Sequence, residues 1–314
     1  MPVAYETHEL PLAGGAVATL IHLRPERPRG VAFLYVHGFS DYVFQDHVAE
    51  HLAARGVGFW GLDLRRYGRS LRPGDLPAYV ADVSEHFEEL DAALAAVLAD
   101  GQDDVVVSGH STGGLITPLW LDARRGTEAV GHVRGLVLNS PWFELAGSPK
   151  TRRKVHLAAM AIGRVAPTRV LATLPSAYGK TLHRDYDGEW EFDLAWKPIE
   201  GFPVRAGWLR AIRRAHARLH RGLHVPAPVL LLRSDRSVLG RREVTPELFR
   251  GDAILDVRDM HEHLGDLGTD VTEVVLEGAL HDVMLSALPV RTRALEELDA
   301  WMDRVLGARD AQPA

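Results

Sequence analysis

The chain has 314 residues, of which 46% are hydrophobic and 25% are charged, and its formal net charge is −6. This composition is typical of a globular protein with a sizeable core, and the acidic balance argues against a nucleic-acid-binding protein. The chain contains no cysteine, which excludes disulfides, cysteine-ligated metal sites and a thiol nucleophile.

The N-terminus and the apolar runs bear on location. Residues 1–6 (MPVAYE) have neither the basic region nor the apolar region of a secretory signal peptide. None of the apolar runs has the length needed to span a bilayer. We therefore expect no signal peptide, no transmembrane segment and a cytoplasmic location.

The first half of the chain predicts strands that alternate with helices. Two short strands are expected around the turn at Gly14 and Gly15. Apolar runs typical of strands buried on both faces of a parallel sheet follow at residues 31–36, 57–62, 105–107 and 133–138. Periodic apolar residues predict helices over residues 43–55, 81–98 and 115–121.

The alternation pauses after residue 141. Residues 142–224 contain four tryptophans and no clear buried strand. The pattern then resumes with a strand at 229–232, a helix over 254–264, a strand at 271–276, a helix over 290–306 and a short tail.

This order of elements predicts an α/β fold. We expect a mostly parallel central sheet with helices on both faces and an inserted, mainly helical cap. The core would comprise residues 1–141 and 225–314, and the cap residues 142–224. A site at the carboxyl ends of the strands would lie beneath such a cap.

Residues 105–115 (VVVSGHSTGGL) combine a strand, a sharp turn and the start of a helix. Ser111 lies between Gly109 and Gly113, which is the G-x-S-x-G pattern of a serine exposed above a sheet. Small residues on either side let the strained chain fold tightly, and the helix N-terminus favours negative charge. The pattern predicts that Ser111 is a nucleophile; the alternative is a plain glycine-rich turn.

A serine hydroxyl needs a base to remove its proton, and that base needs a carboxylate to orient it. His281 follows the predicted strand at 271–276 and precedes the last helix, so we predict that it is the base. We interpret His37 and His110, which flank the expected site, as structural residues of turns.

Two aspartates compete for the role of the acid. Asp235 follows the strand at 229–232 at once, whereas Asp252 stands just before the next predicted helix. One helix and one strand with short loops fit in the 29 residues (281 − 252) that separate Asp252 from His281. We therefore favour Asp252, with a helix N-cap or a solvated loop acid as the alternative for either aspartate.

The tetrahedral intermediate of acyl transfer needs backbone N–H donors for its oxyanion. We predict that Thr112, the residue after Ser111, supplies one donor. The loop after the strand at 31–36 would supply the other, because the glycine bend at Gly38 can aim the Phe39 amide at the same point.

These motifs together resemble the α/β-hydrolase superfamily in their order and spacing. They are the His37-Gly38-Phe39 loop, the 63–70 loop (DLRRYGRS), residues 109–114 (GHSTGG) and the late His281. The nearest resemblance is to the branch of serine aminopeptidases (S33-type), monoacylglycerol lipases and lysophospholipases, and it covers residues 1–140 and 225–308.

The resemblance implies Ser111 as nucleophile, His281 as base and an acid before the penultimate helix. The family's Asp-x-aliphatic-aliphatic-polar run matches residues 252–256. Two departures stand out: Arg66 occupies a position where the family commonly has glycine, and the stretch 234–250 is longer than usual, which keeps Asp235 open as the acid.

The implied reaction is hydrolysis of a carboxylic ester, such as a monoacylglycerol or a lysophospholipid, through an acyl-enzyme. The resemblance implies no metal and no organic cofactor, and a serine at this turn disfavours the haloalkane dehalogenases and epoxide hydrolases of the superfamily. One alternative is an aminopeptidase, for which Glu189, Glu191 and Asp193 would bind an α-amino group. Another is a non-catalytic binding protein on the same fold.

The cap carries six arginines and no acidic residue between Phe202 and His224. Apolar residues at helical spacing in this stretch predict an amphipathic helix with a basic face. We interpret it as a helix packed over the core, and the alternative is a lid that contacts an anionic membrane surface. Four cap aromatics would either line an acyl pocket or fill the cap's own core: Tyr178, Trp190, Phe192 and Trp196.

Overall fold

The computed structural model describes residues 3–310. Eight strands within this range form one sheet in the order β1-β2-β4-β3-β5-β6-β9-β10. The β1–β2 and β2–β4 pairs are antiparallel and the other pairs are parallel, which confirms the predicted mostly parallel sheet. The strands are β1 (Glu6–Pro11), β2 (Val17–Leu23), β3 (Val31–Val36), β4 (Val57–Asp63), β5 (Asp104–His110), β6 (Val133–Asn139), β9 (Val229–Ser234) and β10 (Val271–Leu276).

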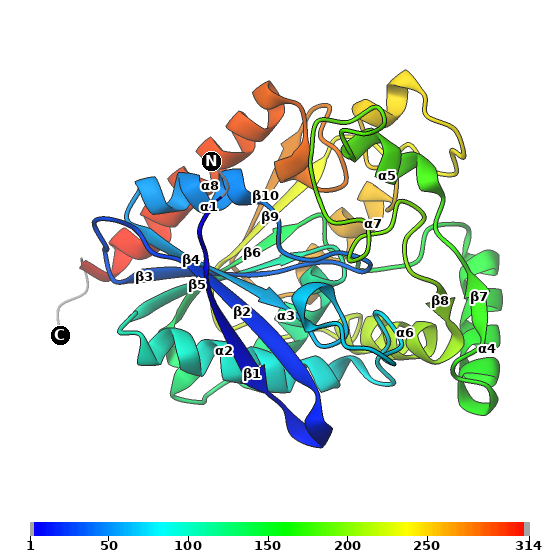
Figure 1. Cartoon of the computed structure of the whole chain (residues 1–314), viewed down its shortest axis with the longest axis horizontal. Helices are drawn as coiled ribbons and strands as arrows, with labels where there is room; N and C mark the ends of the chain where they lie inside the picture. Colours follow the sequence, from blue (N-terminus) through cyan, green and yellow to red (C-terminus); the bar gives the residue numbers. More distant parts are fainter. Residues whose placement is uncertain (1–2, 311–314) are drawn as a thin grey trace.

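Helices cover both faces of this sheet (Figure 1). The α-helices in the described range are α1 (Asp46–Ala54), α2 (Phe87–Ala99), α3 (Gly113–Ala123), α4 (Pro149–Val165), α5 (Ser176–Leu182), α6 (Ala206–Leu219), α7 (Val257–Glu262) and α8 (Leu288–Asp310). α1 and α8 pack on one face through residues such as Leu52 and Leu298, and α2 and α3 pack on the other through Leu90 and Leu115. In residues 3–310, no helix is both long and apolar enough to cross a membrane.

In two helices the start differs from the predicted one because a side chain caps the backbone locally. The predicted helix over 81–98 begins as a 3-10 turn, Val83–His86, where Asp82 and Glu85 form a reciprocal capping box. α7 begins at Val257 rather than residue 254, because Asp256 caps it. The last helix extends to Asp310, past the predicted end at residue 306, and the end of the expected tail lies outside the described residues.

The chain between β6 and β9 contains α4, α5, α6 and a two-stranded sheet of β7 (Val170–Ala172) and β8 (Val204–Arg205). α6 buries its apolar face, including Trp208, Ile212 and Leu219, in the main core. Its basic face meets acidic residues: Arg213 pairs with Glu144, Arg214 with Asp82 and Arg218 with Asp122. These contacts favour the interpretation of α6 as a helix packed over the core.

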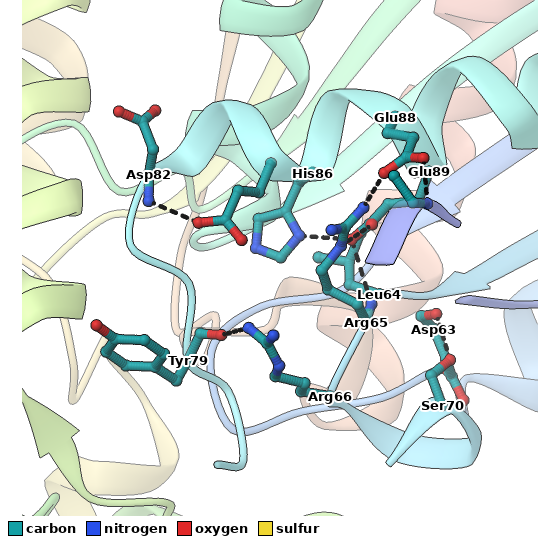
Figure 2. A network of polar contacts seen from close by, with 12 residues as sticks. Asp63, Leu64, Arg65, Arg66, Ser70, Tyr79, Asp82, His86, Glu88 and Glu89 are labelled. Atoms are coloured by element: carbon teal, nitrogen blue, oxygen red, sulfur yellow. Dashed lines mark hydrogen bonds and ion pairs between the residues drawn. The ribbon is translucent and has the colours of Figure 1, made fainter. Parts of the chain in front are cut away.

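A network of charged side chains holds the loop after β4 against the start of α2 (Figure 2). Arg65 Nε donates to Glu89 Oε2 at 2.5 Å, and Arg65 Nη2 donates to Glu88 Oε2 at 2.7 Å. His86 Nδ1 lies 2.6 Å from Glu89 Oε1, and Arg65, His86 and Glu89 are all buried. Glu89 is therefore a buried carboxylate bound by two partners.

Arg66 lies beside this network with a backbone φ of 64°, in the left-handed region that favours glycine. This conformation costs a non-glycine residue about 1–2 kcal/mol. Its guanidinium donates to the Tyr79 carbonyl at 2.6 Å (Figure 2), and its own carbonyl accepts from the Ala78 amide at 3.0 Å. The departure from the family's glycine thus ties the loop after β4 to residues 78–79.

Replacing Glu89 by Gln tests how much the buried network contributes to stability. We expect Glu89→Gln to lower the free energy of unfolding by about 3–5 kcal/mol, because the buried Arg65 charge loses its buried carboxylate and keeps only the exposed Glu88 as a charged partner. Glu88→Gln is the matched control: the Glu88 side chain is 42% exposed, so we expect a loss of about 0–1 kcal/mol. Urea denaturation measures both values, and equal losses in the two variants would contradict the assignment.

The contribution of Glu89 also depends on pH. Burial by itself raises the pKa of the Glu89 carboxyl, but the charges and hydrogen bonds of His86 and Arg65 outweigh it and lower the pKa below its ordinary value. The unfolded chain therefore binds the proton at a higher pH than the folded chain. The stabilisation is present above the ordinary glutamate pKa and lost as the pH falls through the folded pKa. We expect the difference in stability between wild type and Glu89→Gln to shrink in acid.

Candidate active site

Ser111 sits in a strained turn between β5 and α3, with a backbone φ of 53°. The glycines around it leave no room for a side chain. A Cβ at Gly109 would lie 2.5 Å from the Gly113 carbonyl oxygen, and a Cβ at Gly113 would lie 2.5 Å from the Val36 carbonyl oxygen. The Ser111 amide donates to the Asn139 carbonyl at 3.0 Å, which ties the turn to the end of β6.

Three side chains form one hydrogen-bonded chain at this turn. His281 Nε2 lies 3.0 Å from Ser111 Oγ, and His281 Nδ1 lies 2.9 Å from Asp252 Oδ2. The exposed fractions are 8% for Ser111, 3% for His281 and 0% for Asp252. Because Nδ1–H donates to the carboxylate, Nε2 is the acceptor for the serine proton. The other oxygen of Asp252 accepts from the amides of Ile254 and Leu255, both at 2.8 Å, which fixes the carboxylate.

Asp235, the other candidate acid, has a different position. Its Oδ1 accepts from the Gly278 amide at 2.9 Å, and its carboxylate pairs with Arg236. The loop between Arg236 and Asp252 bulges outward and then returns, so that the Asp252 amide donates to the Arg236 carbonyl at 2.9 Å. The structure therefore brings Asp252 to His281 and leaves Asp235 at the turn directly after β9.

The two predicted oxyanion donors belong to residues beside Ser111. Phe39 and Thr112 line the same cavity as the serine. A Cβ at Gly38 would lie 3.0 Å from the Ser111 Cβ, so the loop after β3 presses against the nucleophile. The loop after β3 and the start of α3 therefore both border the cavity at Ser111.

His37 and His110 are buried next to this site, and their imidazole rings form hydrogen bonds with backbone groups. His37 Nε2 accepts from the Leu64 amide at 3.1 Å, and its Nδ1 donates to the Gly38 carbonyl at 2.8 Å. His110 Nδ1 donates to the Asn139 carbonyl at 3.1 Å. Burial lowers the pKa of both imidazoles, which favours their neutral forms.

Above Ser111 lies a cavity of about 310 Å³, within the range of about 300–1,000 Å³ of small-molecule sites. Most of its lining residues are apolar and come from both the core loops and residues 142–224. Of the four cap aromatics, Tyr178 and Phe192 line the cavity. Trp190 and Trp196 are not among the lining residues and pack against an apolar cluster that also contains Phe192.

Sequence reasoning missed a second buried carboxylate next to His281. Asp282 accepts from Asn139 Nδ2 at 2.7 Å and from Gln45 Nε2 at 3.1 Å. Burial by itself raises the pKa of the Asp282 carboxyl, but the pKa lies below its ordinary value, and the hydrogen bonds from these two amide donors contribute to the lowering. The available signal for a polar partner here was the position of Asn139 at the end of a buried strand.

Within residues 3–310, no group of three or more His, Asp or Glu side chains is arranged to hold a metal ion.

Comparison with known protein families finds a match over most of the chain. The family described as serine aminopeptidase, S33, matches residues 26–286. A monoacylglycerol lipase of Mycolicibacterium smegmatis is 32% identical over 117 residues, which cover 36% of this chain and 38% of that protein. The matched segment thus spans well under half of that relative.

Solved structures share the fold over almost the whole chain. A monoglyceride lipase from Saccharomyces cerevisiae, solved as a soluble variant, has a TM-score of 0.72 at 17% identity, covering 96% of this chain and 97% of that chain. A monoacylglycerol lipase from Paleococcus ferrophilus has a TM-score of 0.64 at 20% identity, covering 91% and 99%. These likenesses confirm the predicted fold, and the family match confirms the resemblance seen in the sequence.

The reactivity of Ser111 toward a fluorophosphonate probe tests which aspartate orients His281. We expect Asp252→Asn to slow labelling by about 10⁴-fold, because an amide at that position favours the wrong histidine tautomer. Asp235→Asn, the matched control, should change the rate little because Asp235 does not contact His281. Mass spectrometry of the labelled protein over time measures both rates, and the reverse order would overturn the assignment.

Proposed function

The chain belongs to the serine aminopeptidase S33 family, and from this premise we propose that it is a serine ester hydrolase that works through an acyl-enzyme. The observation that carries the proposal is the hydrogen-bonded chain of Ser111, His281 and Asp252 at the floor of a mostly apolar cavity. In this proposal the three residues are the nucleophile, the base and the acid of a catalytic triad.

The geometry supports the following steps. His281 Nε2 takes the Ser111 proton as Oγ attacks the ester carbonyl, and Asp252 stabilises the imidazolium that forms. The Phe39 and Thr112 amides bind the oxyanion of the tetrahedral intermediate. His281 then protonates the leaving alcohol and later activates the water that releases the acid. The reaction as proposed uses no metal or organic cofactor.

The cavity supports an acyl ester as the substrate. Its apolar lining, including Leu174, Leu182 and Phe192, suits a hydrocarbon chain, because moving such a chain out of water lowers the free energy. Likeness to monoacylglycerol lipases supports the same substrate class. We propose a monoacylglycerol, a lysophospholipid or a similar ester.

We also propose the division of the chain into a hydrolase core, residues 1–141 and 225–314, and a cap, residues 142–224. The inserted helices lie at one end of the sheet (Figure 1). The cavity is lined by residues from both parts, such as Ser111 and Ile254 from the core and Tyr178 and Trp208 from the cap. The cap thus supplies much of the proposed acyl site.

An aminopeptidase needs a carboxylate free to bind the substrate's α-amino group. Glu189 pairs with Arg291, Glu191 pairs with Arg184, and Asp193 accepts from a neighbouring backbone amide. Asp41 is the one acidic residue among the described residues that line the cavity, and its carboxylate accepts from Lys197 Nζ at 2.7 Å. These pairings favour the ester hydrolase.

Two substrate panels distinguish the two activities: p-nitrophenyl esters of increasing acyl length, and aminoacyl-nitroanilides. We expect wild type to hydrolyse the esters and leave the nitroanilides largely intact. Ser111→Ala should lower kcat on the esters by about 10⁶-fold, because the nucleophile is lost. Absorbance of the released nitrophenol or nitroaniline measures both reactions. If wild type were no faster than Ser111→Ala on either panel, a non-catalytic binding protein would be the better interpretation.

A further inference from the structure

The loop of residues 39–44 joins the predicted oxyanion donor Phe39 to α1, and we call it the oxyanion loop. Cap residues contact it along its length. The contacts are Phe39 with Trp208 (ring centroids 4.1 Å apart), Ser40 Oγ with the Phe202 amide (2.8 Å), Asp41 Oδ1 with Lys197 Nζ (2.7 Å), Tyr42 OH with the Asp193 amide (2.8 Å) and Phe44 with Phe192 (ring centroids 5.2 Å apart).

The middle of the oxyanion loop needs this support. Ser40, directly after Phe39, has a φ of 54°, a left-handed conformation that a non-glycine residue keeps only when its surroundings enforce it. At its end the loop is held by the core, because the Val43 amide donates to Asp63 Oδ1 at 2.8 Å. Between these points, the side-chain hydrogen bonds of residues 40–42 in the described structure all go to the cap.

Among the three polar contacts, the ion pair of Asp41 and Lys197 is the one made by a cap side chain, because the other two are donated by the backbone amides of Phe202 and Asp193. The exposed fractions are 13% for the Lys197 side chain and 3% for that of Asp41. The Lys197 ammonium also lies over the rings of Phe44 and Phe192, at 5.4 and 5.6 Å from their centroids. Without Lys197, Asp41 would be a buried, unpaired carboxylate, and the loop would have to move to hydrate it.

We propose that Lys197, acting through Asp41, is a positioning residue that holds the oxyanion loop so that the Phe39 amide points at the oxyanion. Lys197 does not itself contact the reacting atoms in this proposal. It follows that the donor is aligned only while the cap is docked on the core, so the cap completes the catalytic site as well as covering it. The inference rests on the proposed function.

Kinetics of Lys197→Met on a p-nitrophenyl ester test the proposal. We expect kcat to fall by about 10-fold to 100-fold with KM close to the wild-type value, because a displaced donor weakens transition-state binding. Lys197→Arg keeps the charge and should restore most of kcat. Arg184→Met is the control: it removes an exposed ion pair with Glu191 in the same cap, away from the oxyanion loop. A wild-type kcat, a loss confined to KM, or an equal loss in Arg184→Met would overturn the proposal.

Two further measurements separate positioning from general damage. An alkyl boronic acid forms a tetrahedral adduct with Ser111, and its affinity for Lys197→Met should fall in parallel with kcat. Hydrogen exchange of residues 39–44 should be faster in Lys197→Met than in wild type or Arg184→Met, and unchanged exchange would refute the proposal. Exchange needs no activity, so it still decides the role of Lys197 if wild type hydrolyses no ester and the proposed function fails.

Discussion

The left-handed turn at Ser111 is the constraint on which the rest of the site depends. A non-glycine residue at a φ of 53° is strained, and it persists because packed neighbours leave the chain no other path. Gly109 and Gly113 allow the close approach of the next helix and of β3, and the bond from Ser111 to the Asn139 carbonyl ties the turn to β6. The parallel sheet therefore holds the serine hydroxyl where the loops after β9 and β10 deliver Asp252 and His281.

Much of this framework could be predicted from the sequence, because both of its signals are local. A strand buried on both faces reads as a continuous apolar run, and residues 31–36 were predicted with the bounds that β3 has. The glycines around Ser111 mark a turn that other residues would not fit. Helix ends were less predictable, because Asp82 (together with Glu85) and Asp256 start their helices through side-chain caps that periodicity does not show.

The parts that escaped prediction join residues far apart in the chain. Asp282 and Gln45 lie 237 residues apart, and Lys197 and Asp41 lie 156 apart, and no motif links either pair. The cap aromatics were ambiguous for a related reason: in an irregular segment, spacing does not say which way a side chain points. Phe192 reaches the cavity whereas Trp190, two residues earlier, donates its indole N–H to the Leu285 carbonyl.

The same cap residues shape the cavity and contact the oxyanion loop, so the two roles are physically coupled. Phe192 lines the cavity, packs on Phe44 of the loop and lies beneath the Lys197 ammonium. Trp208 lines the cavity and packs on Phe39. A substitution that reshapes this wall for a different acyl chain would therefore also shift the backbone that carries the Phe39 amide. Under the proposed function, acyl specificity and catalytic rate would change together wherever the cap residue involved touches residues 39–44, and separately elsewhere in the cap.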